Sequence, residues 1–356
     1  MTHIWLRAET RADEMRCPLT PHGAATLIKQ GIRLSVEDMS DRIFPTDAYR
    51  DAGCEIVEAE HWPSAPKDAF ILGLKELPHN NSPLIHRHIM FGHAFKGQHS
   101  GLRLLRQFKA GGGALLDLEH LMDDTGRRVA AFGYWAGFAG AAVTLMAWAA
   151  QQQGKICPAV TAYPNQDAML ADIRSKLDQL EKTRPTAIIV GALGRVGGGV
   201  ADLCTAYGVN CTKWDLEETA SGGSFSEILQ HDLFFNCVLA KANTPIFVPL
   251  SACTAVRQLT MIGDISCDPD SDYNPVPLYS KATDWSCPVV RVAEELPLDV
   301  MAIDNLPSLL PRESSEDFAE QLLPHLQNLH KASDPIWQSA AEVFEHHINA
   351  LGKDHT

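Results

Sequence analysis

Glycines are concentrated directly after the apolar run Thr186–Val190, at Gly191, Gly194 and Gly197. Glycine allows a tight turn and lets backbone N–H groups approach a pyrophosphate, whose charge the start of a following helix favours. Asp215 follows at the end of the next β-prone run, roughly twenty residues on, where a dinucleotide fold places the acid that accepts ribose hydroxyls. An acid there repels a 2′-phosphate, so the pattern predicts NAD rather than NADP. The alternative is a plain tight turn with Asp215 capping a loop.

Three further polar segments follow apolar runs in the first third of the chain, around Arg16, Lys75 and His93. Open α/β sheets bind their ligands beyond the carboxyl ends of their strands, where these segments are expected to lie. Lysine and histidine can transfer protons, and arginine binds carboxylates with two parallel hydrogen bonds. The pattern predicts a second ligand site in this part of the chain.

Short β-prone runs that alternate with helical stretches are expected to position both sites. The predicted strands are 4–6, 33–36, 55–57, 70–74, 88–91 and 114–117, then 186–190, 210–214, 233–238, 261–265 and 289–292. Such alternation predicts an α/β protein with parallel sheets. We expect two Rossmann-like domains with a cleft between them: a substrate-binding catalytic domain of residues 1–131 and 316–356, and an NAD-binding domain of residues 132–315.

Residues 129–153 contain no charged side chain and are long enough to span a bilayer. They are mostly alanine and glycine, and Gly133 and Gly137 have a spacing that also suits close helix packing in a soluble protein. No second apolar span follows. We predict a long buried helix that crosses between the domains.

The formal net charge of −14 argues against a nucleic-acid or anionic-membrane partner, because both require clustered lysine and arginine. Nine cysteines without a CxxC pair do not suggest a secreted disulfide framework, and the N-terminus does not resemble a signal peptide. The histidines show no zinc-binding spacing. These patterns predict a cytoplasmic protein that needs no metal.

The chain resembles the lysine-forming saccharopine dehydrogenases, which are relatives of alanine dehydrogenase. The resemblance is carried by the three polar segments, by residues 126–133 (GRRVAAFG) and by residues 303–312 (IDNLPSLLPR), and it extends from the first strand to the last helix. It implies NAD-dependent, reversible conversion of saccharopine to L-lysine and 2-oxoglutarate. Leu239 and Cys267 depart from the family pattern, which has tyrosine and alanine there, and neither is a reacting group.

The resemblance also implies roles for individual residues. The catalytic pair falls on Lys75 and His93. The implied substrate contacts are Arg16, Lys75, Gln98, Arg128, Phe132, Ser266, Cys267 and Asp268. The cofactor contacts, with the glycines described above, are Arg127, Gly191, Gly194, Arg195, Gly197, Asp215, Thr219, Ile265, Ile303, Asp304, Asn305 and Leu306.

Elementary chemistry agrees with these implied roles. Saccharopine carries three carboxylates and a secondary amine, so Arg16 and Arg128 suit the carboxylates. A lysine among other cations has a lowered pKa, which suits Lys75 as the base that deprotonates the amine. A histidine can exchange protons near neutral pH, which suits His93 in the hydrolysis of the imine.

Each residue also has an ordinary structural interpretation. Lys75 could be a surface charge or pair with Glu76, and His93 could be a buried structural histidine. Arg127 and Arg128 could be a solvated pair at a helix start, although cations there oppose the helix dipole, which favours anionic ligands for them. Glu76 and Glu119 are candidates for tuning the charge of the site.

Two other functions remain open on the sequence. The chain could be a related dehydrogenase of another amino acid or opine, because the pocket and not the fold decides the substrate. It could also be an NAD-binding regulator without activity, which the joint presence of Arg16, Lys75, His93 and Arg128 argues against. The expected partners are small molecules only, bound by a monomer or a small homo-oligomer.

Overall fold

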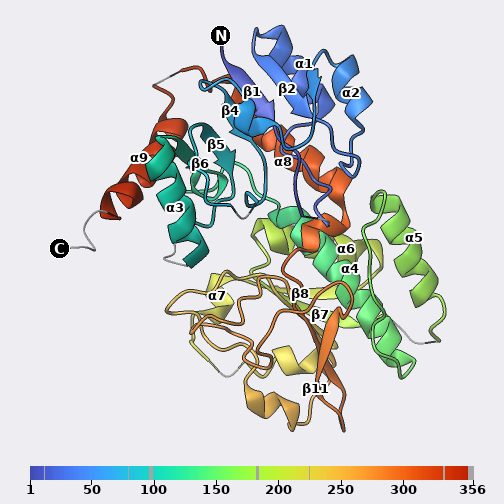
Figure 1. The fold of residues 1–356 in the computed structure, drawn as a ribbon. Helices are drawn as coiled ribbons and strands as arrows, with labels where there is room; N and C mark the ends of the chain where they lie inside the picture. The colour runs from blue at the N-terminus through green and yellow to red at the C-terminus, as the bar shows by residue number, and fades with distance from the viewer. Residues whose placement is uncertain are drawn as a thin grey trace. The chain divides into compact units, whose positions relative to one another are not determined.

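The computed structural model describes residues 1–11, 13–78, 80–95, 99–181, 184–223, 225–331 and 333–351. The chain forms two compact units. The first unit contains Met1–Ala131 and Ser314–Thr356, so it combines the blue and red ends of the chain in Figure 1. The second unit is Phe132–Glu313, which ends at 313 where the sequence suggested 315.

The first unit is built on a six-stranded parallel sheet with the order β3-β2-β1-β4-β5-β6. Its strands are β1 (His3–Leu6), β2 (Arg33–Glu37), β3 (Glu55–Val57), β4 (Phe70–Leu72), β5 (Arg87–Met90) and β6 (Ala114–Asp117). The strand order reverses between the neighbours β1 and β4. A reversal of this kind opens a crevice at the carboxyl ends of the strands, which is where such sheets bind ligands.

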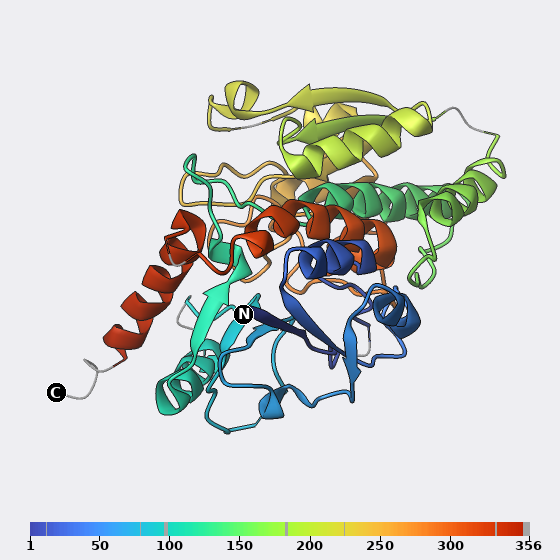
Figure 2. The same cartoon turned by 90° about the horizontal axis from the view of Figure 1, so that it is seen from above.

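Helices from both ends of the chain cover this sheet. They are α1 (Pro21–Lys29), α2 (Thr46–Asp51), α3 (His99–Gly111), α8 (Pro311–Gln327) and α9 (Pro335–Ala350), with short 3-10 turns at Trp62–Ser64 and Leu118–His120. The helix α8 lies beside α1, where Leu323 approaches Gly23 (Figure 2). Phe344 of α9 packs on Phe108 of α3 with ring centroids 5.5 Å apart. The C-terminal helices therefore complete the core of the first unit.

The second unit has its own six-stranded sheet, with the order β11-β12-β10-β9-β7-β8. Its strands are β7 (Thr186–Val190), β8 (Asn210–Trp214), β9 (Leu233–Asn236), β10 (Met261–Asp264), β11 (Val289–Ala293) and β12 (Leu298–Met301). All pairings are parallel except that of β11 with β12. The sequence did not predict β12, because Asp299 interrupts its apolar run. That carboxylate is 1% exposed and accepts a 2.8 Å hydrogen bond from Nε of Arg291.

The helices of the second unit include the long apolar one that the sequence predicted. They are α4 (Gly133–Gln152), α5 (Gln166–Leu177), α6 (Arg195–Ala206) and α7 (Leu216–Thr219), with 3-10 turns at Ile228–Gln230, Leu250–Cys253 and Leu306–Leu309. The sequence predicted that this long helix crosses between the domains, whereas the whole of α4 belongs to the second unit and packs against α6. A Cβ on Gly137 would lie 1.9 Å from the carbonyl oxygen of Val196, so glycine is required for this close packing.

Among the described residues, no helix combines the length and the apolar character needed to cross a membrane. The predicted fold class, an α/β protein with two parallel sheets, is confirmed.

One buried histidine of the first sheet is expected to make the fold sensitive to acid. His88 of β5 is 0% exposed and packs between the rings of Trp62 and Phe108, at centroid distances of 5.0 and 5.4 Å. Neither ring nitrogen has a hydrogen-bond partner within the described part of the chain. Burial, with smaller contributions from Arg7 and His86, holds the pKa of His88 well below its usual value of 6.5.

We therefore expect His88→Leu to make the protein more resistant to acid. The unfolded chain binds a proton near pH 6.5 that the folded protein excludes, so wild-type stability falls as the pH drops below 6.5. The loss is about 1.4 kcal/mol of unfolding free energy per pH unit. Melting temperatures of both proteins at pH 5 and pH 8 test this. The melting temperature of the variant, relative to that of the wild type, should be higher at pH 5 than at pH 8. An equal difference in melting temperature at both pH values would contradict the role of His88.

Candidate active site

The glycine-rich turn joins β7 to α6 in a shape that side chains would obstruct. Gly191 has a φ of +86°, which other residues rarely adopt. A Cβ on Gly197 would lie 2.3 Å from the carbonyl oxygen of Gly191. Gly194 is the N-cap of α6 and Arg195 is its first residue, so the turn leads directly into the positive end of a twelve-residue helix. This arrangement suits a pyrophosphate.

Asp215 lies where β8 ends and caps the short helix α7. Its Oδ1 accepts a 2.9 Å hydrogen bond from the N–H of Leu216, and its Oδ2 accepts a 3.0 Å bond from the N–H of Leu193 in the glycine-rich turn. Asp215 thus has a capping role, as the alternative interpretation expected, but it caps a helix rather than a loop. Each carboxylate oxygen can accept more than one hydrogen bond, so the cap does not prevent ribose binding.

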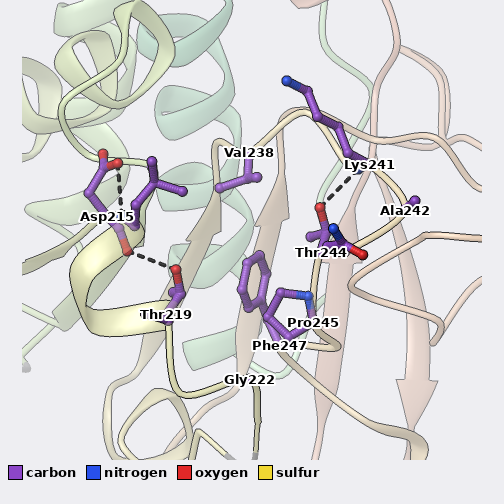
Figure 3. A pocket seen from close by; sticks show the side chains of 13 residues that line it. Asp215, Thr219, Gly222, Val238, Lys241, Ala242, Thr244, Pro245 and Phe247 are labelled. Atoms are coloured by element: carbon purple, nitrogen blue, oxygen red, sulfur yellow. Dashed lines mark hydrogen bonds between the residues drawn. The ribbon is translucent and has the colours of Figure 1, made fainter.

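A cavity of about 510 Å³ lies beside Asp215, between α7 and the segment that follows β9 (Figure 3). Its size is within the range of small-molecule sites. Thr219, which donates a 2.8 Å hydrogen bond to the carbonyl oxygen of Asp215, lines one side. Val238, Pro245 and Phe247 supply apolar walls. A carboxylate beside an apolar cavity matches a ribose with an attached purine, so these residues fit the adenosine half of a dinucleotide.

In the first unit, Lys75 follows β4 and lies close to a buried ion pair. Arg16 is 3% exposed, and its Nε and Nη2 donate to the two oxygens of Glu14 at 2.8 and 2.6 Å. Burial, followed by the charge of Arg16, lowers the pKa of Lys75, and Glu14 opposes this shift. The environment thus favours a neutral amine at Lys75, as a base requires. Glu14 was not predicted as a site residue, although an acid two residues before an arginine is a usable signal.

The Glu14 carboxylate changes the expectation for Arg16. Burial disfavours the charged form of Glu14, but the charge and hydrogen bonds of Arg16 prevail and hold the pKa of Glu14 below its usual value. Two guanidinium nitrogens of Arg16 are therefore occupied by an internal partner. A substrate carboxylate would meet a neutralised pair rather than an isolated cation.

His93 follows β5 in a conformation that is unusual for its residue type. Its φ is +47°, in the left-handed region, where such residues are concentrated at functional sites. The Nδ1 atom lies 3.6 Å from Oε2 of Glu119, and the side chain is 46% exposed. The interaction with the Glu119 carboxylate raises the pKa of His93 above its usual value, with burial acting in the opposite direction. His93 is therefore accessible, and the neighbouring carboxylate favours its protonated form.

The other predicted residues of the first unit lie in different settings. Arg127 and Arg128 are exposed and lie on a hairpin turn, where Asp123 accepts from the N–H of Arg127 at 2.9 Å and Met122 pairs with Arg128. The helix begins only at Gly133, so the argument from the helix dipole was wrong for both arginines. Gln98 lies outside the described residues.

In the second unit, Phe132 is the N-cap of α4. The strand β10 ends at Asp264, a buried carboxylate that holds the segment after it. Asp264 accepts hydrogen bonds from Asn236 at 2.8 Å and Tyr279 at 2.7 Å. Burial raises the pKa of the Cys267 thiol to about 12, so it stays protonated. Ser266 is half-buried.

The remaining predicted residues after β10 and β12 differ in exposure. The side chains of Ile265, Ile303 and Leu306 belong to the core of the second unit. Asp268 and Asp304 are exposed, and Asn305 is the N-cap of a 3-10 turn. Over the ranges that the structure describes, no three His, Cys, Asp or Glu side chains are grouped as metal ligands.

Comparison with known proteins identifies the family to which the chain belongs. Residues 5–139 match the family model "Alanine dehydrogenase/PNT, N-terminal domain". The saccharopine dehydrogenase [NAD(+), L-lysine-forming] of Schizosaccharomyces pombe is 41% identical over 98% of this chain and 99% of its own. The protein of the same name from Candida glabrata is 44% identical over 97% and 96%.

Among solved structures, an L-alanine dehydrogenase has a TM-score of 0.64 at 16% identity and covers 97% of this chain and 94% of its own. The transhydrogenase from Sinorhizobium meliloti has a TM-score of 0.59 at 15% identity, over 92% and 94%. These two likenesses concern the fold alone. The full-length similarity to the curated relatives shows that the chain belongs to the family of the NAD-dependent, L-lysine-forming saccharopine dehydrogenases.

Proposed function

We propose that the protein oxidises saccharopine to L-lysine and 2-oxoglutarate with NAD, and catalyses the reverse reaction. The observation that carries the proposal is the setting of Lys75, a half-buried amine with a lowered pKa beside the Arg16–Glu14 pair. It lies after β4, beside the point where the strand order reverses. This is an environment for a base that works near a carboxylate-bearing substrate.

In this proposal Lys75 and His93 divide the proton transfers. Neutral Nζ of Lys75 takes the proton from the secondary amine, because only a neutral amine can lose a hydride from its adjacent carbon. Bound NAD supplies the hydride acceptor. His93, whose pKa Glu119 raises, accepts a proton from the attacking water as neutral imidazole and donates it to the departing lysine amine. Arg16 and Arg128 are proposed to bind carboxylates, Arg16 as part of its pair with Glu14.

The cofactor is proposed to lie along the glycine-rich turn and in the cavity beside Asp215. Gly191, Gly194 and Gly197 provide a backbone surface for the pyrophosphate. The cavity walls accommodate the adenosine. Arg127, Arg195 and the segments after β10 and β12 remain predicted contacts.

A substrate comparison tests the proposal directly. Purified protein is mixed with NADH and either L-lysine plus 2-oxoglutarate or pyruvate plus ammonia, and NADH oxidation is followed. We expect rapid oxidation only with the first pair. Oxidation only with the second pair would identify a different amino-acid dehydrogenase. No oxidation with either pair, in a protein that still binds NADH, would identify a binding protein without this activity.

Replacement of Asp215 should reduce the preference for NAD. Asp215→Ala removes the acceptor for the ribose hydroxyls and the negative charge that repels a 2′-phosphate. We expect kcat/KM for NAD to fall by roughly 10-fold or more, the scale of a lost hydrogen bond to a charged group. The value for NADP should change less or rise. The test is to measure kcat/KM for NAD and for NADP in the wild type and in Asp215→Ala. A wild type that uses NADP as well as NAD would refute the preference.

We further propose that the protein works in a reducing compartment such as the cytoplasm, with small molecules as its only partners. All nine cysteines are free thiols. Burial raises the pKa of several, including Cys54 to about 11 and Cys157 to about 12, which keeps these thiols unreactive. A monomer or a small homo-oligomer remains our prediction, and sedimentation analysis distinguishes them.

A further inference from the structure

A second buried ion pair contacts the backbone of Lys75 rather than its side chain. Glu9 accepts hydrogen bonds from the N–H of Leu74 at 2.7 Å through Oε1 and from the N–H of Lys75 at 2.9 Å through Oε2. The guanidinium of Arg7 donates to the carbonyl oxygen of Lys75. Both residues lie just beyond β1, the strand that pairs with β4. The backbone polar groups of Lys75 are thus held by two charged side chains.

This ion pair is fully enclosed in the first unit. The side chains of Arg7 and Glu9 are 1% and 3% exposed, and Nη2 of the arginine lies 3.3 Å from Oε2 of the glutamate. Burying two charges is costly, and apolar residues of the same volume often stabilise a fold equally well. Stability alone is therefore a weak reason for charges here. Their hydrogen bonds to the chain that carries Lys75 give a more specific reason.

Gly73 leaves the space that the guanidinium of Arg7 occupies beside Lys75. A Cβ on Gly73 would lie 2.4 Å from Nε of Arg7, so a larger residue would displace the guanidinium. The N–H of Arg7 also bonds to the carbonyl oxygen of Leu72 at 3.0 Å, which extends the pairing of β1 with β4 up to this point. The segment Gly73–Lys75 is consequently fixed from one side by the sheet and by a buried charge pair.

We propose that Arg7 and Glu9, the Lys75 clamp, are positioning residues that hold the amine of Lys75 in its reactive place. They act through the backbone of Lys75 and touch no reacting atom. The inference rests on the proposed function, because it presumes that Lys75 is the base. Rigid support of this kind matters because a small misplacement of a catalytic group lowers the rate strongly.

Glu9→Gln tests the clamp with little change of shape, because the amide turns an NH₂ group toward one of the two backbone N–H groups. We expect kcat/KM for saccharopine to fall roughly 10- to 100-fold, the scale for a misplaced catalytic group. Burial is the main cause of the lowered pKa of Lys75. A loosened segment should admit water, so the Lys75 limb of the pH–rate profile should move to higher pH.

Gly73→Ala gives a second, charge-neutral disturbance of Arg7 and should act in the same direction. Each substitution is then combined with Lys75→Met. If the clamp works through Lys75, neither should lower kcat/KM much further in that background. Independent losses that multiply would show a general structural role and overturn the proposal.

Asp299→Asn is the matched control, because Asp299 is a buried carboxylate paired with Arg291 in the second unit. It should cost stability but leave the pH–rate profile unmoved. NADH fluorescence and melting temperature show whether each variant is folded at the assay temperature. An equal pH shift in Asp299→Asn, or an unchanged profile in a folded Glu9→Gln, would overturn the clamp.

The failure of the proposed function is recognised separately. If the wild type does not oxidise NADH with L-lysine and 2-oxoglutarate, the function fails. Amide hydrogen exchange at Leu74 and Lys75 then tests whether the clamp holds these two backbone N–H groups. Exchange there should be faster in Glu9→Gln than in the wild type, and unchanged exchange would overturn the clamp as a structural feature.

Discussion

Lys75→Met is expected to lower kcat/KM for saccharopine by about 10²- to 10⁴-fold, the usual contribution of one general acid–base group. The methionine keeps the length and removes the proton acceptor. In the wild type, the rate should rise with pH through the pKa of Lys75, which burial and Arg16 place below the usual value of 10.5. This limb of the profile should disappear in the variant.

The control for Lys75→Met is Lys75→Arg, which keeps a positive charge that does not dissociate near neutral pH. It should be as inactive as the methionine variant if the neutral amine matters, and nearly active if only the charge matters. Deuterium at the transferred hydrogen adds a second measurement. Amine deprotonation precedes hydride transfer, so the isotope effect on kcat should remain visible in Lys75→Met.

His93→Gln is expected to lower kcat by a similar factor, about 10²- to 10⁴-fold, but at a later step. The glutamine can form hydrogen bonds and cannot exchange protons near neutral pH. Hydrolysis of the imine follows hydride transfer, so slower hydrolysis should mask the deuterium isotope effect on kcat. Indistinguishable isotope effects and pH profiles in the Lys75 and His93 variants would show that the two residues act as one unit.

Glu119→Gln separates the tuning of His93 from its chemistry. The Glu119 carboxylate raises the pKa of His93 by stabilising the imidazolium. Removing its charge should lower that pKa, so the His93 limb of the pH–rate profile should move to lower pH. The variant should retain more activity than His93→Gln at the pH where the imidazole is correctly protonated. Glu76, the other acid proposed to tune the site, raises the pKa of His93 with a smaller effect.

The architecture could be predicted largely because apolar runs and glycines act locally. The run Thr186–Val190 followed by Gly191 predicted both β7 and the turn that leads into α6. Errors arose where a buried charge interrupted the pattern. Asp299 concealed β12, because the sequence alone does not show that Arg291 pairs with it. The start of α4 was also placed too early, because the uncharged run begins at Val129 but the helix begins only at Gly133.

For the candidate site, the sequence supplied residue types and the structure supplied their partners. Asp215 could be named from its spacing after the glycines, whereas the resemblance to a known family implied the roles of Lys75 and His93. The Glu14 contact of Arg16 and the Glu9 contact of Lys75 could not, because they depend on which side chains are buried together. In a linear sequence, these two buried carboxylates cannot be distinguished from ordinary surface acids.

The division of the first unit between both ends of the chain has a consequence for synthesis on the ribosome. The second unit is continuous in sequence and can fold as soon as it has emerged. The first unit lacks α9 until residues 335–350 are made. Until then, Phe108 and its neighbours are not covered by Phe344. A nascent or truncated chain therefore exposes apolar surface at this place, where chaperones or proteases would recognise it.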